Sequence, residues 1–411
     1  MERVVFFQYL LRFSLLSLLF SQTCFVIAGS SDFSAELALE GRYFLEKGLQ
    51  EQERLQPSLR GELEFQKRID ADNFNFVLFG RLDSEDDERS HADIREAYWT
   101  HVADGWETKI GISKVFWGVT ESRHLVDVIN QTDLVENVDT EDKLGQPMIK
   151  FAVERDWGNL DFFWLPYFRE QTFGGQDGRL NPLPFIVDTK NAQYESSAEQ
   201  WHSDFALRFA TRVGDLDLAI SHFTGTSRNP VLVFNGSITD PRFTPIYRQI
   251  DQTGLELQYI FEDWLWKFEG ITSSGELQRY SAAVFGFEYT QVGIFETAAD
   301  LGWIVEYLFD DRHGHANDSV KSAPHNFERD VFLGWRYAMN DVDSTEILTG
   351  VIYDPKTEES LYSIEFSQRL ASDLKINVEL RAFQGSEQDS ELKAYYMRDE
   401  DYIQLELVKF F

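Results

Sequence analysis

The C-terminal segment constrains the fold more than any other part of the chain. It reads DYIQLELVKFF over residues 401–411, with apolar side chains at Ile403, Leu405, Leu407 and Phe411 and polar ones at Tyr402, Gln404 and Glu406. This two-residue period predicts a β-strand with one lipid-like face. Such a strand needs partners on both edges, because hydrocarbon does not tolerate unpaired N–H and C=O groups. The preceding strand is one partner and the first strand is the other, so we expect a closed barrel.

This ending resembles the final strand of bacterial outer-membrane β-barrel proteins, which stops on Phe after apolar residues at every second position. The resemblance implies that the barrel-assembly machinery reads the segment ending at Phe411. Lys409 departs from the pattern, since an apolar or aromatic residue is usual there. A lipid-facing Lys near the interface costs about 0 to 1 kcal/mol and extends its ammonium group to water, so the departure is tolerable.

The beginning of the chain agrees with an exported protein. Arg3 and Arg12 flank an apolar opening, residues 13–28 carry no charge, and residues 26–28 suit a signal peptidase. We expect cleavage of a signal peptide, residues 1–28, and one barrel domain over residues 29–411. An N-terminal anchor is less favoured, because a spanning helix needs roughly 20 residues. A lipoprotein at Cys24 is weaker still, and cleavage removes this single cysteine, which excludes a disulfide scaffold.

Charge and aromatic content narrow the class of partner. The net charge of −32 argues against nucleic acid as a partner. Aromatic residues make up 15% of the chain, which is high for so polar a sequence. A membrane barrel reconciles the two properties, because only alternate residues face lipid and aromatic residues mark both interfaces.

The chain divides into segments of the length that a membrane strand requires. We predict about eighteen strands, at residues 34–44, 58–69, 73–83, 92–102, 106–114, 148–155, 158–166, 203–213, 215–225, 253–262, 264–272, 279–290, 301–309, 329–339, 344–354, 359–370, 373–383 and 401–411. About 10 residues tilted near 45° span roughly 23 Å, which matches the apolar band of outer-membrane barrels. The fold class is therefore all-β, a closed antiparallel transmembrane barrel.

The connections carry an independent signal. Short links that contain Asp occur at residues 70–72, 103–105, 156–158, 213–215, 262–263, 340–343 and 371–373. Long links alternate with them, at residues 45–57, 115–147, 167–202, 226–252, 310–328 and 384–400. Short periplasmic turns and long extracellular loops are typical of outer-membrane barrels. All ten prolines fall outside the predicted strand interiors. Residues 291–300 are long for a turn and could hide a hairpin arm, so sixteen strands remain possible.

A soluble β-sandwich or propeller is the rival fold. It is less favoured because soluble strands bury their apolar face in a core and need no systematic alternation of short and long links.

The residues opposite the apolar faces should line a wet lumen, and they carry charges of both signs. The candidates are Arg60, Glu62, Glu64, Arg68, Arg81, Lys150, Glu154, Arg208, Arg212, Lys267, Glu269, Glu306, Arg336, Glu365, Arg369 and Arg381. Fixed charges in a narrow pore sort solutes by charge. The alternative is that these residues pair with one another and only fill the wall.

One long link is unusually apolar. Residues 115–134 read VFWGVTESRHLVDVINQTDL. So apolar a segment should fold back into the barrel mouth, or pack as a short helix against the wall, instead of extending into water. It resembles the segment near WG…D…NP.D in porin-like barrels of the alginate-export kind, with Gln131 in place of Pro and Glu121 in place of Asp. The resemblance implies a constriction element at residues 115–147, with candidate residues Trp117, Glu121, Arg123, Asp127, Asn130 and Asp133. Asp127, Asn130 and Asp133, at spacings of three, could hold a divalent ion, but helix capping and loop hydrogen bonds are the more common use of such residues.

Signals of catalysis or of a cofactor are weak, and we predict no enzyme, no metal and no cofactor. No HExxH, GxxxxGK[ST] or GxSxG motif occurs. His313, His315 and His325 share one outer loop, where solvation is the simpler role. Ser203 beside His202, or Ser221 beside His222, could join a triad, but adjacent residues on a strand do not face each other.

These observations favour a passive porin-like channel in the outer membrane of a Gram-negative bacterium, for small hydrophilic and charged solutes. The partners of such a barrel are outer-membrane lipid and lipopolysaccharide, and an acidic outer rim would attract the divalent ions that bridge lipopolysaccharide. The alternative, which is favoured for the acidic residues themselves, is that they are simply solvated in the outer loops. A lipase-like or protease-like enzyme and an adhesin or receptor that acts through its outer loops are the alternatives.

Overall fold

The computed structural model describes residues 30–181, 183, 185–237, 240–274, 278–312, 320–322, 328–385 and 396–411. The expected signal peptide lies outside these residues, as do His313, His315 and His325. Within the described ranges, no helix is long and apolar enough to cross a membrane.

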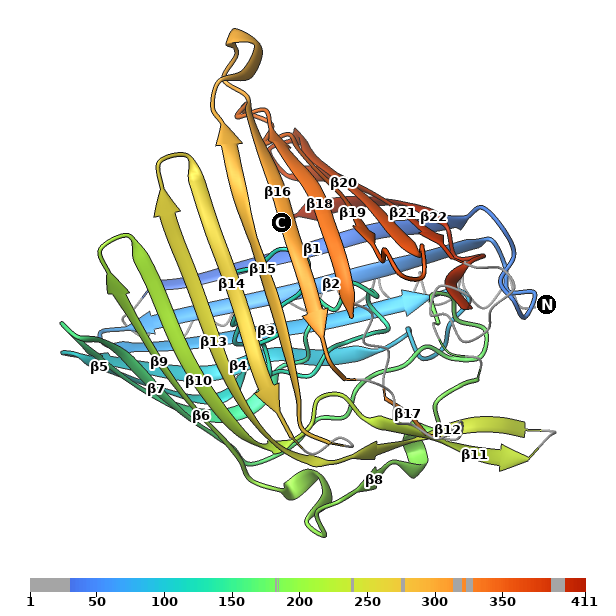
Figure 1. Ribbon diagram of the computed structural model, residues 1–411, viewed down its shortest axis with the longest axis horizontal. Coiled ribbons are helices and arrows are strands. Elements are labelled where there is room, and N and C mark those ends of the chain that lie inside the picture. The colour runs from blue at the N-terminus through green and yellow to red at the C-terminus, as the bar shows by residue number, and fades with distance from the viewer. Residues whose placement is uncertain are drawn as a thin grey trace, which may run out of the picture.

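Eighteen antiparallel strands form one closed sheet (Figure 1). They are β1 (Ser30–Phe44), β2 (Leu55–Ile69), β3 (Asp72–Asp83), β4 (Ala92–Ala103), β5 (Trp106–Ser113), β6 (Gln146–Arg155), β7 (Gly158–Leu165), β9 (Asp204–Val213), β10 (Leu216–Thr226), β13 (Gln249–Phe261), β14 (Trp264–Ser273), β15 (Tyr280–Gln291), β16 (Asp300–Asp310), β18 (Arg329–Ala338), β19 (Glu346–Tyr353), β20 (Ser360–Ala371), β21 (Leu374–Gln384) and β22 (Tyr402–Phe410). Strand β1 pairs with β2 on one side and with β22 on the other, which closes the barrel.

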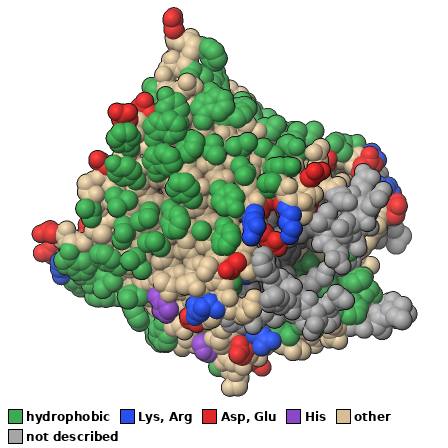
Figure 2. Space-filling model, viewed as in Figure 1, with side chains coloured by type: hydrophobic (Ala, Val, Ile, Leu, Met, Phe, Trp, Pro, Cys, Tyr) green, Lys and Arg blue, Asp and Glu red, His purple; other side chains and the backbone are tan. Residues whose placement is uncertain are grey.

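The side chains of the C-terminal strand alternate between exposed and buried, as predicted. Ile403 and Leu405 are 42% and 47% exposed on the outside, whereas Tyr402 and Glu406 are 1% and 8% exposed on the inside. Lys409 lies on the outer face and forms an ion pair with Asp373 of the adjacent short turn. Figure 2 shows apolar side chains spread over the outer face of the barrel wall that includes β13–β16. The barrel therefore presents an apolar surface to lipid.

The two ends of the barrel differ as the links predict. One end carries short turns, and the other carries long connections. Residues 291–300, expected to allow a hairpin arm, contain a single 3₁₀ turn at Ile294–Glu296 between β15 and β16. The alternative of sixteen strands is therefore wrong, because both flanking strands pair directly with each other.

Three of the long outer links contribute to a second, small sheet. Its strands run in the order β17 (Val320–Ser322), β11 (Val231–Ser237), β12 (Asp240–Tyr247) and β8 (Gln193–Tyr194). Prolines were predicted outside strand interiors, and those that lie in strands are within three residues of a strand end: Pro241 and Pro245 in β12, Pro57 in β2 and Pro147 in β6. The last two lie near the outer ends of strands, where a missing N–H donor costs little of the ladder.

Candidate functional site

The connection between β5 and β6, residues 114–145, turns into the barrel, and we call it the inner loop. Its Trp117, Val126 and Ile129 are at most 3% exposed and pack in one apolar cluster with inward-facing residues of the wall. The rings of Trp117 and Phe163 meet edge to face, with centroids 5.6 Å apart. The apolar composition of the inner loop is therefore satisfied by burial against the inside of the barrel, as its sequence predicts.

Two buried carboxylates of the wall hold the first half of the inner loop. The amides of Val119 and Thr120 donate to Glu269 Oε1 at 2.6 and 2.9 Å. The amides of Glu121 and Ser122 donate to Glu306 at 2.7 and 2.8 Å. Glu269 and Glu306 are 0% and 1% exposed, so these charges are compensated by the inner loop and do not face solvent. They fix the inner loop against β14 and β16.

Asn130 closes the neck of the inner loop. Its side-chain oxygen accepts a hydrogen bond from the Val115 amide at 2.8 Å. Its NH₂ group donates to the carbonyls of Ser113 and Leu144, each at 2.9 Å. This is the loop-bonding role preferred from the sequence for Asn130, because every polar atom of the buried amide has a backbone partner.

The nearby acidic residues of the inner loop also have cationic partners. Asp127 lies 3.4 Å from the ammonium group of Lys143, and Asp133 lies 2.7 Å from Arg95. Burial raises the pKa of Asp127. Burial acts in the same direction on Asp133, but the nearby His91 and the charge of Arg95 lower the pKa of Asp133 to about 2.

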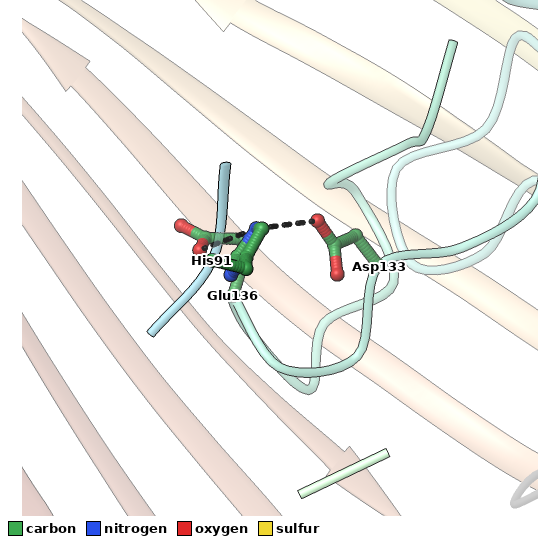
Figure 3. A group of neighbouring side chains, drawn as sticks. All are labelled: His91, Asp133 and Glu136. Atoms are coloured by element: carbon green, nitrogen blue, oxygen red, sulfur yellow. Dashed lines mark ion pairs between the residues drawn. The ribbon is translucent and has the colours of Figure 1, made fainter. Parts of the chain in front are cut away.

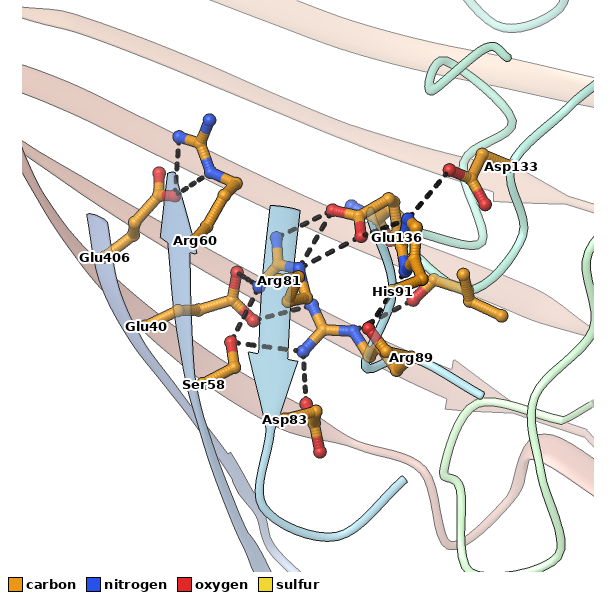
Figure 4. A network of polar contacts seen from close by, with 12 residues as sticks. Glu40, Ser58, Arg60, Arg81, Asp83, Arg89, His91, Asp133, Glu136 and Glu406 are labelled. Atoms are coloured by element: carbon orange, nitrogen blue, oxygen red, sulfur yellow. Dashed lines mark hydrogen bonds and ion pairs between the residues drawn. The ribbon is translucent and has the colours of Figure 1, made fainter. Parts of the chain in front are cut away.

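An ion-pair network holds the second half of the inner loop (Figure 4). Arg81 of β3 contacts Glu136 of the inner loop at 2.7 Å and Glu40 of β1 at 2.9 Å. Arg89 contacts Glu40 at 2.8 Å and Asp83 at 2.7 Å. All these side chains are at most 5% exposed. Buried charges with several partners fix the relative position of the elements that carry them.

His91, Asp133 and Glu136 form a compact group at the edge of this network (Figure 3). His91 Nδ1 lies 3.0 Å from the Arg89 carbonyl, and Nε2 lies 3.6 Å from Asp133 and 3.7 Å from Glu136. Three such atoms could surround a metal ion, but Arg95 and Arg81 already neutralise the two carboxylates. Coupling to the acids raises the pKa of His91 against the opposing effect of burial, which suits an imidazolium in the ion-pair network.

The inner loop reaches the opposite wall. Asp139 accepts from Arg381 of β21 at 2.9 Å, and Glu121 accepts from Arg336 of β18 at 2.8 Å. A cavity of about 690 Å³ lies beside the inner loop and is also lined by inward-facing residues of β18–β21. The inner loop thus packs tightly against β14 and β16 and leaves open space toward β18–β21.

The strand register places the sixteen predicted lumen residues on the inward face. Some form ion pairs with one another or with neighbouring residues, which agrees with the alternative that these charges pair within the wall. Arg208 contacts Glu256 at 2.9 Å, and Lys267 contacts Glu288 at 3.2 Å. Lys150 lies 3.6 Å from Asp161, and Arg212 lies 3.6 Å from Asp217.

Other lumen candidates follow the same pattern. Arg60 pairs with Glu36 and with Glu406, the latter at 2.9 Å, and Arg381 lies 3.3 Å from Glu365. Four further candidates lie inward by strand register: Glu62, Arg68, Glu154 and Arg369. The role of any of these residues in sorting solutes stays a prediction.

Several residues of the site were missed from the sequence. Arg42, Arg89, Arg95 and Glu136 belong to the buried network or adjoin it. The alternation of Glu36, Ala38, Glu40 and Arg42 in the first strand was the available signal for Arg42. Arg89 and Glu136 lie in loops, so no strand period marks them.

The alternative triads have no geometric support. Ser221 and His222 lie on opposite faces of β10, and His222 Nδ1 lies 2.9 Å from Thr253 Oγ1. His202 Nδ1 lies 2.8 Å from Asp204, while Ser203 Oγ accepts a hydrogen bond from Trp164 at 3.2 Å. Neither serine is hydrogen-bonded to its neighbouring histidine.

Solved structures with this architecture match nearly the whole chain. OccD3 (OpdP) of Pseudomonas aeruginosa has a TM-score of 0.52 at 9% identity, covering 93% of this chain and 91% of its own. A BenF-like porin from Pseudomonas fluorescens has a TM-score of 0.53 at 8% identity, covering 94% and 99%. The fold is that of the outer-membrane porins. The chain is also similar in structure to Wzi of Escherichia coli, a carbohydrate-binding β-barrel involved in group 1 capsule assembly, with a TM-score of 0.53 at 10% identity, covering 93% of this chain and 84% of Wzi. No family model and no curated sequence matches the chain.

Proposed function

We propose that this protein is a passive channel in the outer membrane of a Gram-negative bacterium, which lets small hydrophilic and charged solutes diffuse through its lumen. The observation that carries the proposal is the open cavity of about 690 Å³ beside an inner loop that crosses the lumen. A barrel of this strand number is wide enough for an aqueous channel, whereas a barrel of eight strands is filled by its own side chains.

The inner loop would act as the constriction of this channel. It is hydrogen-bonded to residues of β14, β16, β18 and β21, so the transient loss of one of these contacts would not displace it. Glu121 and Arg336 bring opposite charges together between loop and wall, and Arg336 remains 40% exposed to solutes. Paired charges of both signs in a narrow passage favour hydrated polar solutes over apolar ones.

The proposed channel would also have partners in the outer membrane. Phe411 is 70% exposed beside the outer apolar face, where the barrel-assembly machinery would meet it. The outer loops would meet lipopolysaccharide, with divalent ions between acidic side chains and phosphate groups. The net charge of −32 makes a nucleic-acid partner unsuitable.

Planar lipid bilayers test the channel directly. Purified protein added to one side should produce stepwise increases in current, and a salt gradient should give a reversal potential that reports the ion preference. A folded barrel that inserts into liposomes but gives no current would overturn the proposal. Hydrolysis of lipid or peptide by that preparation would instead favour the enzyme alternative.

A further inference from the structure

Four apolar side chains form a continuous row inside the barrel, at the height of the cavity. Phe332, Ile352, Leu361 and Phe383 come from β18, β19, β20 and β21. Each lies directly opposite the next in strand register, and all four line the cavity. We call this set the apolar row. Because neighbouring strands are 4.7–4.9 Å apart, the apolar row extends about 14 Å around the wall.

The apolar row is only partly covered by the protein. Phe332 belongs to the apolar cluster of the inner loop, and Ile352 packs at the margin of that cluster. Phe383 packs at the margin of a second cluster formed by Phe44, Leu180, Met397 and Tyr402. Leu361 lies between the two clusters and lines the cavity. An apolar surface left in a wet lumen is unfavourable, unless a ligand covers it.

The two inward rows nearer the short turns have a different chemistry. The first consists of Gly334, Gly350, Ser363 and Arg381, and the ring of Phe332 packs over its two glycines. The next consists of Arg336, Leu348, Glu365 and Glu379. Successive inward rows are about 7 Å apart along a strand. Charges of both signs thus lie within one or two rows of the apolar surface.

Residues of the inner loop line the cavity together with the apolar row. Among them are Leu125 and Val128, which are 8% and 7% exposed. Arg123 and His124 of the inner loop line the same cavity. A cavity of several hundred cubic ångströms with apolar walls and a few placed polar groups has the form of a small-molecule site.

We propose that the lumen binds small amphipathic solutes, with an apolar body of ring or short-alkyl size on the apolar row and a charged end on the rows beneath it. The inference rests on the proposed channel function and deepens it by naming the class of solute. Because successive inward rows are about 7 Å apart, a small molecule whose ring lies on the apolar row can also reach the next inward row, which contains Arg381.

L-Phenylalanine and L-alanine are matched probes, because they share one zwitterionic end and differ only in the apolar body. Each is titrated against the single-channel current in a planar bilayer. Phenylalanine should reduce the current at a concentration about tenfold lower than alanine, from partial burial of its ring. Equilibrium binding of both probes to the folded protein in detergent, by calorimetry, gives a readout that does not need a current.

Substitutions locate the effect. Leu361→Thr and Ile352→Thr each replace one member of the apolar row and should remove most of the tenfold preference. Ile364→Thr is the control, because Ile364 lies on β20 with Leu361 but is 43% exposed on the outer face. Thr is β-branched and suits a strand, so all three variants should fold; unchanged migration of the unheated barrel in detergent gels checks this.

The outcomes separate the two proposals. A channel that conducts but responds equally to both probes overturns the inference and leaves the channel function intact. A preference that survives Leu361→Thr and Ile352→Thr also overturns it, because the ring would then bind elsewhere. Preferential binding in calorimetry without any current supports the amphipathic site and overturns the channel.

Discussion

Glu269 of the barrel wall accepts two hydrogen bonds from Thr120 of the inner loop, one from its amide at 2.9 Å and one from its hydroxyl at 2.7 Å. The carboxylate is fully buried and comes from a strand 149 residues further along the chain. It is therefore a structural anchor for the inner loop, although the sequence suggested only a lumen charge. This relationship leads to the first of four predictions.

Glu269→Ala should loosen the inner loop. The substitution leaves the buried donors of Val119 and Thr120 without an acceptor, at a cost of about 1–3 kcal/mol for each unsatisfied group. We expect a larger and noisier single-channel current, because the inner loop would no longer be held against the wall. Glu64→Ala is the control, since Glu64 also faces inward but, among the described residues, accepts a hydrogen bond only from Gln66 of its own strand, at 2.7 Å. Equal currents in both variants would contradict the anchoring role.

Arg81→Met should destabilise the barrel strongly, because it leaves Glu136 and Glu40 buried without their shared partner. Removal of one member of a buried ion pair typically costs about 3–5 kcal/mol. Urea unfolding of the protein in lipid vesicles measures the change. The double variant Arg81→Met/Glu136→Gln should lose less than the sum of the two single variants. Additive losses would show that the two side chains do not interact.

His124 should make the stability depend on pH on the alkaline side. Ion pairing with Glu141 at 3.4 Å and Glu269 at 3.8 Å raises its pKa to about 10, although burial acts in the opposite direction. A raised pKa gives stability that is complete below the unfolded value of about 6.5 and is lost as pH rises through about 10. His124→Gln should therefore be less stable than the native protein at pH 7 and equally stable above pH 10. A difference that persists unchanged to pH 11 would argue against an imidazolium.

Deletion of Phe411 should reduce assembly of the barrel. The Phe411 amide donates to the Ala35 carbonyl at 2.9 Å, and its carbonyl accepts from the Ala35 amide at 3.3 Å, at the seam between β1 and the end of the chain. Loss of both bonds and of the terminal ring should lower the amount of folded protein in outer-membrane fractions. Lys409→Leu keeps these backbone bonds and should assemble normally. Normal assembly of the deletion variant would show that the terminal ring is dispensable.

The barrel could be predicted from local patterns of residues alone. In a membrane every strand must present apolar side chains on one face and bond its backbone on both edges, and both requirements leave a local two-residue period. All eighteen predicted segments, from 34–44 to 401–411, coincide with strands to within a few residues. The alternation of short and long links likewise identified the two ends.

The contents of the lumen could not be predicted in this way, because they depend on contacts that exist only in the folded chain. The two-residue period of the strands predicted that Glu269 and Glu306 face inward. It could not show that backbone amides of residues 119–122 donate hydrogen bonds to them. Nor could it show that Phe332, Ile352, Leu361 and Phe383 meet in one row, because strand register depends on all the intervening turns. Contacts between segments far apart in the chain leave no local period, and in this protein those contacts shape the passage.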